Sequence, residues 1–149
     1  MTRGVHSMTF IPISDYGFIG NCHGAALVGK NGSIDWCCIP RFDSPSIFAG
    51  ILDDEKGGHF AITPQGEWSS THRYISDTNV LETRFETADG VAIVTDCMPL
   101  FESATDPSGL TVRHQIIRIV RCARGNVTMN VTYHPMPDYG RADAPISKE

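Results

Sequence analysis

The chain has 149 residues, of which 41% are hydrophobic and 19% are charged, and its formal net charge is −5. The apolar fraction is enough for a core, which argues against intrinsic disorder, and the negative charge offers no basic surface for nucleic acid. No apolar run approaches the roughly 18 residues of a membrane span, and residues 1–10 lack the apolar segment of a signal peptide. We therefore expect a cytoplasmic domain that binds neither nucleic acid nor membranes.

The clearest local pattern is a β-hairpin near the start of the chain. Residues 25–30 and 33–39 are apolar-rich segments that flank Asn31-Gly32. Asn-Gly is the preferred pair of a type I′ turn, because both central residues of that turn need a positive φ. We therefore predict two paired strands joined at Asn31-Gly32.

A helical pattern follows the hairpin. Ser44-Pro45 combines a capping residue with proline at the first helical position, and Gly57 lies beyond the apolar residues that follow. This arrangement predicts one short helix near residues 45–53. Its apolar positions, which recur at helical spacing, are Ile47, Phe48, Ile51 and Leu52.

The rest of the chain consists of short β-rich segments joined by tight turns. Asp89-Gly90 predicts a second hairpin, and alternation is clearest over residues 127–134. This pattern predicts a mainly all-β fold, an antiparallel β-sandwich, over residues 13–135. Residues 1–12 are expected to be disordered or tag-like, and residues 136–149 to be a linker or a severed connection to a missing C-terminal part. The remaining predicted strands cover residues 57–63, 69–75, 81–86, 91–95 and 111–122.

No cofactor or metal site is expected. The glycine-spaced run at residues 17–24 lacks the strand-to-helix context of a phosphate loop, and the six histidines show no metal-ligand spacing. The five cysteines are an odd number with no zinc-type spacing, so reduced thiols in a core are their expected state.

The densest polar and aromatic cluster runs from residue 35 to residue 45. Its candidate site residues are Asp35, Trp36, Arg41, Phe42 and Asp43. A carboxylate and a guanidinium beside aromatic rings can bind a sugar or line a domain interface, and loops at sheet ends commonly carry such sites. The alternative is that Arg41 and Asp43 pair with each other or with the backbone and fix the corner. Catalysis within this chain is not expected.

Strand alternation gives one further expectation for this cluster. It places Ile34, Trp36 and Cys38 on one apolar face, so core packing is the expected role of Trp36.

The same stretch carries a family resemblance. The runs at residues 15–23, 25–28, 31–36 and 40–45 resemble the N-terminal domain of bacterial glucoamylase-like and trehalase-like enzymes of glycoside hydrolase family 15. The similarity covers roughly residues 13–141. It implies a β-sandwich that precedes an (α/α)6 barrel, whose glutamates carry out an inverting hydrolysis of α-glucosidic bonds. Nothing in this chain matches the barrel motifs, so the chain alone is expected to be inactive, with the barrel as its partner and an α-glucan or trehalose as the substrate.

Two other functions stay open. A stand-alone sugar-binding module would use exposed aromatic side chains such as Trp68, Tyr74 or Tyr139. A self-assembling module would form homo-oligomers through exposed strand edges.

Overall fold

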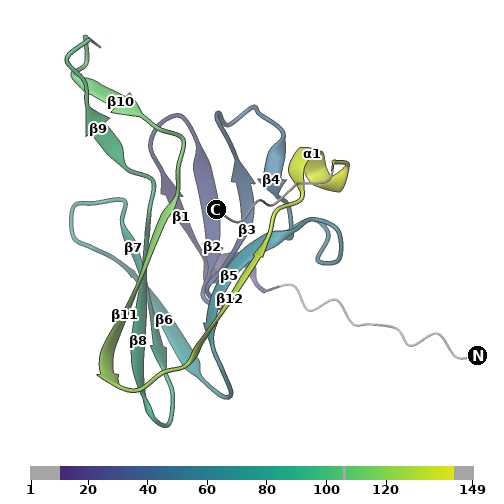
Figure 1. Cartoon of the computed structure of the whole chain (residues 1–149), viewed down its shortest axis with the longest axis vertical. Coiled ribbons are helices and arrows are strands. Elements are labelled where there is room, and N and C mark those ends of the chain that lie inside the picture. Colours follow the sequence, from purple (N-terminus) through teal and green to yellow (C-terminus); the bar gives the residue numbers. More distant parts are fainter. Residues whose placement is uncertain (1–10, 106, 143–149) are drawn as a thin grey trace, which may run out of the picture.

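The computed structural model describes residues 11–105 and 107–142 and is built from three antiparallel sheets (Figure 1). The first sheet has the order β1-β2-β3-β5-β12, with β4 paired to β3, and the second has the order β11-β8-β7-β6. A third, two-stranded sheet pairs β9 with β10. The mainly antiparallel β-sandwich predicted from the sequence is confirmed. The strands are β1 (Tyr16–Gly20), β2 (Ala25–Gly29), β3 (Ser33–Cys38), β4 (Ser46–Phe48), β5 (His59–Pro64), β6 (Ser69–Tyr74), β7 (Leu81–Glu86), β8 (Gly90–Cys97), β9 (Leu100–Glu102), β10 (Leu110–Val112), β11 (Ile117–Gly125) and β12 (Met129–His134).

Both predicted hairpins are present, one of them with a different turn. The strands β2 and β3 flank Asn31-Gly32, and β7 and β8 flank Asp89. In the first turn the Gly32 N–H donates to the Gly29 carbonyl over 2.8 Å, and of Asn31 and Gly32 only Gly32 has a positive φ, of 79°. The type I′ turn was therefore a wrong prediction, although the hairpin itself is confirmed.

A β-bulge in β3 changes which side chains reach the core. Leu27 pairs with Trp36 and the next residue, Val28, pairs with Ile34, so Asp35 is the extra residue on β3. Ile34 consequently lies in the buried cluster between the sheets, and Trp36 does not. Core packing as the role of Trp36 was therefore wrong.

The predicted helix near residues 45–53 was also wrong. Ser46–Phe48 form β4, which pairs with the end of β3, and the chain then turns before β5. Phe48 is buried in the core, but Leu52 is 64% exposed, so the apolar spacing does not describe one buried face. Strand pairing overrides the local helical signal here.

The helical segments of the described chain are short. They are η1 (Ile13–Asp15), a 3-10 turn, and α1 (Pro137–Gly140), which lies beside β4 (Figure 1). No helix among the described residues is long and apolar enough to cross a membrane. The Met136 N–H donates to the Ile47 carbonyl over 2.9 Å and so fixes the start of the predicted linker. Residues 143–149 of that segment and residues 1–10 of the predicted N-terminal tail lie outside the described residues, and the domain division stays a prediction.

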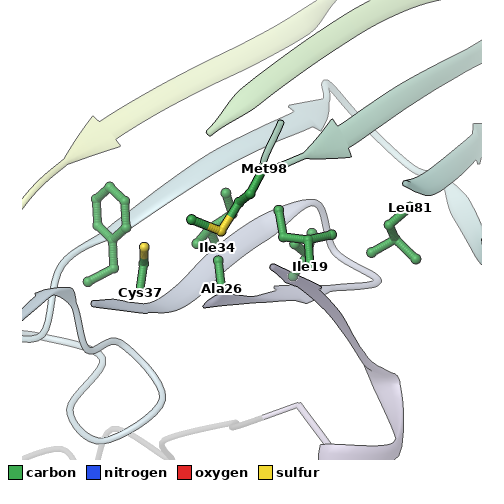
Figure 2. Close-up of a cluster of buried hydrophobic side chains, with 8 residues drawn as sticks. Ile19, Ala26, Ile34, Cys37, Leu81 and Met98 are labelled. Atoms are coloured by element: carbon green, nitrogen blue, oxygen red, sulfur yellow. The ribbon is translucent and has the colours of Figure 1, made fainter. Parts of the chain in front are cut away.

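The core lies between the first and second sheets. Figure 2 shows Ile19, Ile34, Leu81 and Met98 converging from both sides, and the first three are fully buried. Each such side chain contributes roughly 1.5–3 kcal/mol when it leaves water. A second buried cluster joins β5, β7 and β8 through Ile62, Phe85 and Val94.

A buried arginine, paired with an aspartate of its own sheet, also joins the two sheets. Asp96 on β8 and Arg118 on β11 are 0% and 2% exposed, and the Arg118 Nε lies 2.8 Å from Asp96 Oδ1. The same guanidinium donates to the carbonyls of Phe60 and Gly32, which belong to the first sheet and its hairpin turn. Its donors are thus shared between an anion on one sheet and the backbone of the other.

One side of the sandwich is open. The strands β11 and β12 each pair on a single side within the described chain, and both expose apolar side chains. We call this the open flank, and define it by Val120, Val131 and Tyr133, which are 44–65% exposed.

Candidate functional site

The structure separates the five predicted site residues into two groups. Asp35 and Trp36 lie on β3 at the bulge, on the side of the first sheet away from the core. Arg41, Phe42 and Asp43 lie in the loop between β3 and β4. Asp35 and Asp43 line different hollows, so the two carboxylates do not form one site.

The β3–β4 loop holds its charged pair in the open. Arg41 Nε lies 3.1 Å from Asp43 Oδ1, and the two side chains are 70% and 73% exposed. Ser44 closes the loop, because its Oγ accepts from the Arg41 N–H and its own N–H donates to the Arg41 carbonyl. The Arg41 and Asp43 side chains therefore pair with each other, Ser44 bonds to the Arg41 main chain, and both charges of the pair remain exposed.

The loop between β1 and β2 joins this site. The Phe42 N–H donates to the His23 carbonyl over 3.0 Å, and a hollow of about 400 Å³ lies between the two loops. The His23 ring also lies edge-on to the ring of His114 at 6.4 Å. We call this site the end surface, and its lining residues are Cys22, His23, Arg41, Phe42 and Asp43.

Sequence reasoning missed Cys22 and His23. Both lie in the glycine-spaced run 17–24, which was considered as a phosphate loop and as part of the family resemblance but not as a binding site. One signal could have identified them: the polar residues Asn21 and His23 lie in a short loop between two strands. Loops at the end of a sheet commonly carry binding sites.

Asp35 has a different environment. Its carboxylate accepts a hydrogen bond from the Tyr16 hydroxyl over 2.7 Å and another from the Ser33 hydroxyl. Burial raises the pKa of Tyr16, and the hydrogen bond to Asp35 and its negative charge raise it further. The shallow pocket beside Asp35, of about 270 Å³, also includes His59 and Asp54. Asp35 connects β1 to β3 and is committed to two hydroxyl groups.

The aromatic side chains proposed for a sugar-binding module have packing roles. The Trp68 ring packs on buried Phe85 at 5.1 Å. The Tyr74 hydroxyl accepts from the Phe18 N–H and donates to the Phe18 carbonyl, which joins β6 to β1. Tyr139 packs on Trp36 at 6.1 Å and remains 44% exposed.

The described residues contain no cluster of three or more histidine, cysteine or acidic side chains that could hold a metal ion. The five cysteines are free, and burial together with the neighbouring Cys38 raises the pKa of Cys37 to about 12. Cys37 is therefore a core residue without nucleophilic character at neutral pH.

Comparison with known proteins supplies the family. Residues 4–149 match the family described as trehalase-like, N-terminal. The trehalase of Mycolicibacterium smegmatis is 36% identical in an alignment of 146 positions that covers 91% of this chain and 22% of that protein. The trehalase of Mycobacterium tuberculosis is 35% identical over 146 residues, covering 91% and 21% of the two chains, and that of Thermoplasma volcanium is 36% identical over 140 residues, covering 90% and 21%. No solved structure matches significantly.

The chain thus spans about a fifth of the length of these curated relatives. The resemblance seen in the runs around Asn31-Gly32 and residues 40–45 is confirmed across nearly the whole sequence. The chain belongs to the family of trehalase-like N-terminal domains.

Proposed function

We propose that the chain is the noncatalytic N-terminal β-sandwich domain of a trehalase-type glycoside hydrolase. The observation that carries this proposal is the family match over residues 4–149, together with relatives named trehalase that are about five times longer. The substrate of the longer protein is then trehalose or a related α-glucoside. Its catalytic carboxyl groups belong to the part of the protein that this chain lacks.

The carboxylates of the candidate site support a noncatalytic role. Glycoside hydrolysis uses two carboxyl groups that flank one bond, about 5–9.5 Å apart. Asp35 is occupied by Tyr16 and Ser33, and Asp43 is paired with Arg41 in another hollow. The direct test is glucose release from trehalose: the longer protein is expected to hydrolyse it and the 149-residue chain is not. Hydrolysis by the isolated chain would overturn the proposal.

We further propose that the end surface faces the catalytic domain, at the edge of its substrate cleft. The exposed Arg41–Asp43 pair offers donors and acceptors, and Phe42 is 56% exposed beside it. Arg41→Ala in the longer protein should lower kcat/KM for trehalose or the melting temperature. Arg84→Ala is the matched control, because Arg84 forms a similar exposed pair with Glu86 on β7. If Arg41→Ala and the control have the same kcat/KM and the same melting temperature, the end surface does not face the catalytic domain.

A second candidate function is self-assembly, and the open flank favours it. Two neighbouring elements, β11 and β12, have unpaired edges and exposed apolar side chains such as Val131, which is 65% exposed. Such edges pair readily with another chain. Sedimentation velocity of the 149-residue chain tests this: concentration-dependent dimers support self-assembly, and a monomer at all concentrations excludes it.

A further inference from the structure

The outer face of the first sheet carries a polar pocket. The pocket lies on the side away from the core, has a volume of about 270 Å³, and is lined by β1, β3, β5 and the segment between β4 and β5. Pockets for drug-sized ligands usually measure about 300–1,000 Å³, so this one has room for a smaller ligand such as a single hexose ring. We call it the outer pocket, and its polar side chains include Tyr16, Ser33, Asp35, Asp54, His59 and Thr63.

The Asp35 carboxylate is fixed in the outer pocket and still has free acceptor sites. Asp35 is half-buried, and its carboxylate accepts one hydrogen bond from the Tyr16 hydroxyl over 2.7 Å and one from the Ser33 hydroxyl. An ionised carboxylate has about four lone-pair positions for hydrogen bonds, so about two remain. A ligand hydroxyl that donates to Asp35 therefore meets an acceptor whose orientation is already set.

Two further side chains of the outer pocket offer unused hydrogen-bonding groups. His59 and Thr63 on β5 are half-buried, and neither side chain has a hydrogen bond to another described residue. The imidazole and the hydroxyl can both donate and accept. The described lining residues include the carboxylates of Asp35 and Asp54 and no lysine or arginine, so the pocket disfavours phosphates and other anions. A neutral ligand with several hydroxyl groups matches this set of donors and acceptors.

An aromatic row borders the outer pocket. Asp35 and Trp36 are consecutive residues, yet the bulge directs both side chains to the outer face. Leu27 is the direct partner of both Trp36 and Phe18, so these three side chains form one row across β1, β2 and β3. Phe18, at the end of the row, is 49% exposed. A pyranose ring has apolar C–H faces that pack on aromatic rings, and its hydroxyls bind a neighbouring carboxylate.

A strained turn adds Tyr139 to this row. Asp138 and Tyr139 have φ values of 54° and 58°, and Gly140 follows with 77°, so three consecutive residues are left-handed. Residues with a Cβ seldom adopt that region, and such strain concentrates at binding sites. The turn holds the Tyr139 ring 6.1 Å from the Trp36 ring, and Tyr139 stays 44% exposed. The fold thus accepts backbone strain to keep a second aromatic ring on Trp36.

We propose that the outer pocket and the aromatic row bind an α-linked glucose disaccharide without cleaving it. One ring lies in the outer pocket, where its hydroxyls donate to Asp35 and bond to His59. The other ring packs on Trp36 and Tyr139. The inference rests on the proposed function only for the choice of sugar. It goes beyond that function because it gives the longer protein a second place to hold substrate, apart from the catalytic cleft.

The first experiment uses the two tryptophans of the chain as reporters. A nitrogen–proton correlation NMR titration of the 149-residue chain with maltose or trehalose, at millimolar concentrations, follows both indole N–H signals. We expect a saturable shift of the Trp36 signal and none of the Trp68 signal, because Trp68 packs on Phe85 in the core. The absence of a saturable Trp36 shift with both sugars would overturn the proposal. An equal response to a glucose phosphate would overturn it too, since the described lining of the pocket has no cation for a phosphate.

The second experiment assigns the binding to the proposed residues. His59→Ala and Tyr139→Ala should each raise the dissociation constant by about fivefold or more, whereas Tyr139→Phe keeps the ring and should bind as the natural chain does. The matched controls are His114→Ala and Tyr133→Ala, which remove an exposed imidazole and an exposed ring outside the site and should leave the affinity unchanged. Unchanged affinity in both His59→Ala and Tyr139→Ala would show that the sugar binds elsewhere and overturn the proposal.

Glucose release from trehalose by the longer protein tests the proposed function separately. If the 149-residue chain binds neither sugar while the longer protein hydrolyses trehalose, this inference fails and the proposed function stands. If the chain binds the sugars through the outer pocket while the longer protein releases no glucose, the proposed function fails and the sugar site stands.

Discussion

Two arginine–aspartate pairs in this domain have the same chemistry and opposite surroundings. Arg118 and Asp96 lie between the sheets at 2% and 0% exposure, whereas Arg41 and Asp43 lie in an end loop at 70% and 73%. The Arg118 guanidinium also donates to the carbonyls of Phe60 and Gly32. The Arg41 guanidinium pairs with Asp43 while both side chains are exposed to water. The buried pair serves the fold, and the exposed pair contributes almost nothing to it. A charged pair that the fold does not need is available for a partner.

The largest expected effect comes from breaking the buried pair. Arg118→Ala leaves the Asp96 carboxylate buried without its cation and removes the bonds to the other sheet, which should lower the free energy of unfolding by about 3–5 kcal/mol. Urea unfolding followed by circular dichroism measures this change. The double variant Arg118→Met with Asp96→Leu removes both charges and should lose less. If Arg118→Ala lowers the free energy of unfolding by less than about 1 kcal/mol, the buried pair stabilises the fold no more than an exposed pair does.

The next largest effect is expected at the β2–β3 turn, where the Gly32 carbonyl accepts a hydrogen bond from Arg118. Gly32 has a φ of 79°, and an added Cβ would collide with the Ile62 carbonyl and the Phe85 ring. Gly32→Ala should lower the free energy of unfolding by about 2–4 kcal/mol, since it combines backbone strain with that collision. Gly66→Ala is the control, because Gly66 has a φ of 78° and no described atom within 4 Å of an added Cβ. Equal losses in a urea titration would show that the close approach at Gly32 has no energetic role.

A pH dependence is expected beside the buried pair. Burial lowers the pKa of His72, with a further contribution from Lys30, and the Gly29 carbonyl, Asp96 and Asp15 oppose the change. The folded chain therefore favours neutral His72, and stability that is fully present above the ordinary pKa of 6.5 should be lost as the pH falls below it. Urea midpoints between pH 7.5 and 5.5 should drop more for the natural chain than for His72→Gln. Parallel profiles for the two proteins would contradict this assignment.

The smallest effect is expected at the exposed pair. Arg41→Ala in the 149-residue chain should change the free energy of unfolding by no more than about 1 kcal/mol, the range of exposed ion pairs. Arg84→Ala should behave in the same way. Chemical denaturation at low and high salt measures both. A loss of more than about 2 kcal/mol in Arg41→Ala would give that pair a structural role and weaken the case for a partner.

Local sequence patterns predicted both hairpins and most of the later strands, because strand alternation and turn residues act over a few positions. The single strand expected over residues 111–122 was wrong, since that segment contains the separate strands β10 and β11 of two different sheets. The failures arose where pairing between distant segments decides the outcome. The bulge at Asp35 moves Trp36 away from the core. A prediction from strict strand alternation does not include such an extra residue, because the bulge arises in the pairing with β2. Apolar residues recur at helical spacing over residues 47–52, yet Ser46–Phe48 pair with β3 as a strand.

The site was predicted only in part for the same reason. The loop 40–45 was identified from its polar and aromatic residues, but the partner loop with Cys22 and His23 reaches it through the tertiary fold. Asp96 is the one charged residue of β8, whereas Arg118 is one of three arginines on β11, so charge alone would place both side chains on the solvent face. Their proximity follows from the antiparallel register of β8 and β11, in which Arg118 and Asp96 are direct partners.

The strand order of the first sheet has a consequence for synthesis on the ribosome. The strands β1, β2 and β3 pair with near neighbours in the chain, but β5 at residues 59–64 pairs with β12 at residues 129–134. About 65 further residues must therefore leave the ribosome before that edge of β5 is covered, as the register of Asn130 with Thr63 shows. At a usual rate of about 5–20 residues per second, the nascent chain displays an unpaired β5 for several seconds. The second sheet completes its β6–β7–β8 hairpins within that interval, so the closing of the sandwich by β12 is a late, long-range event.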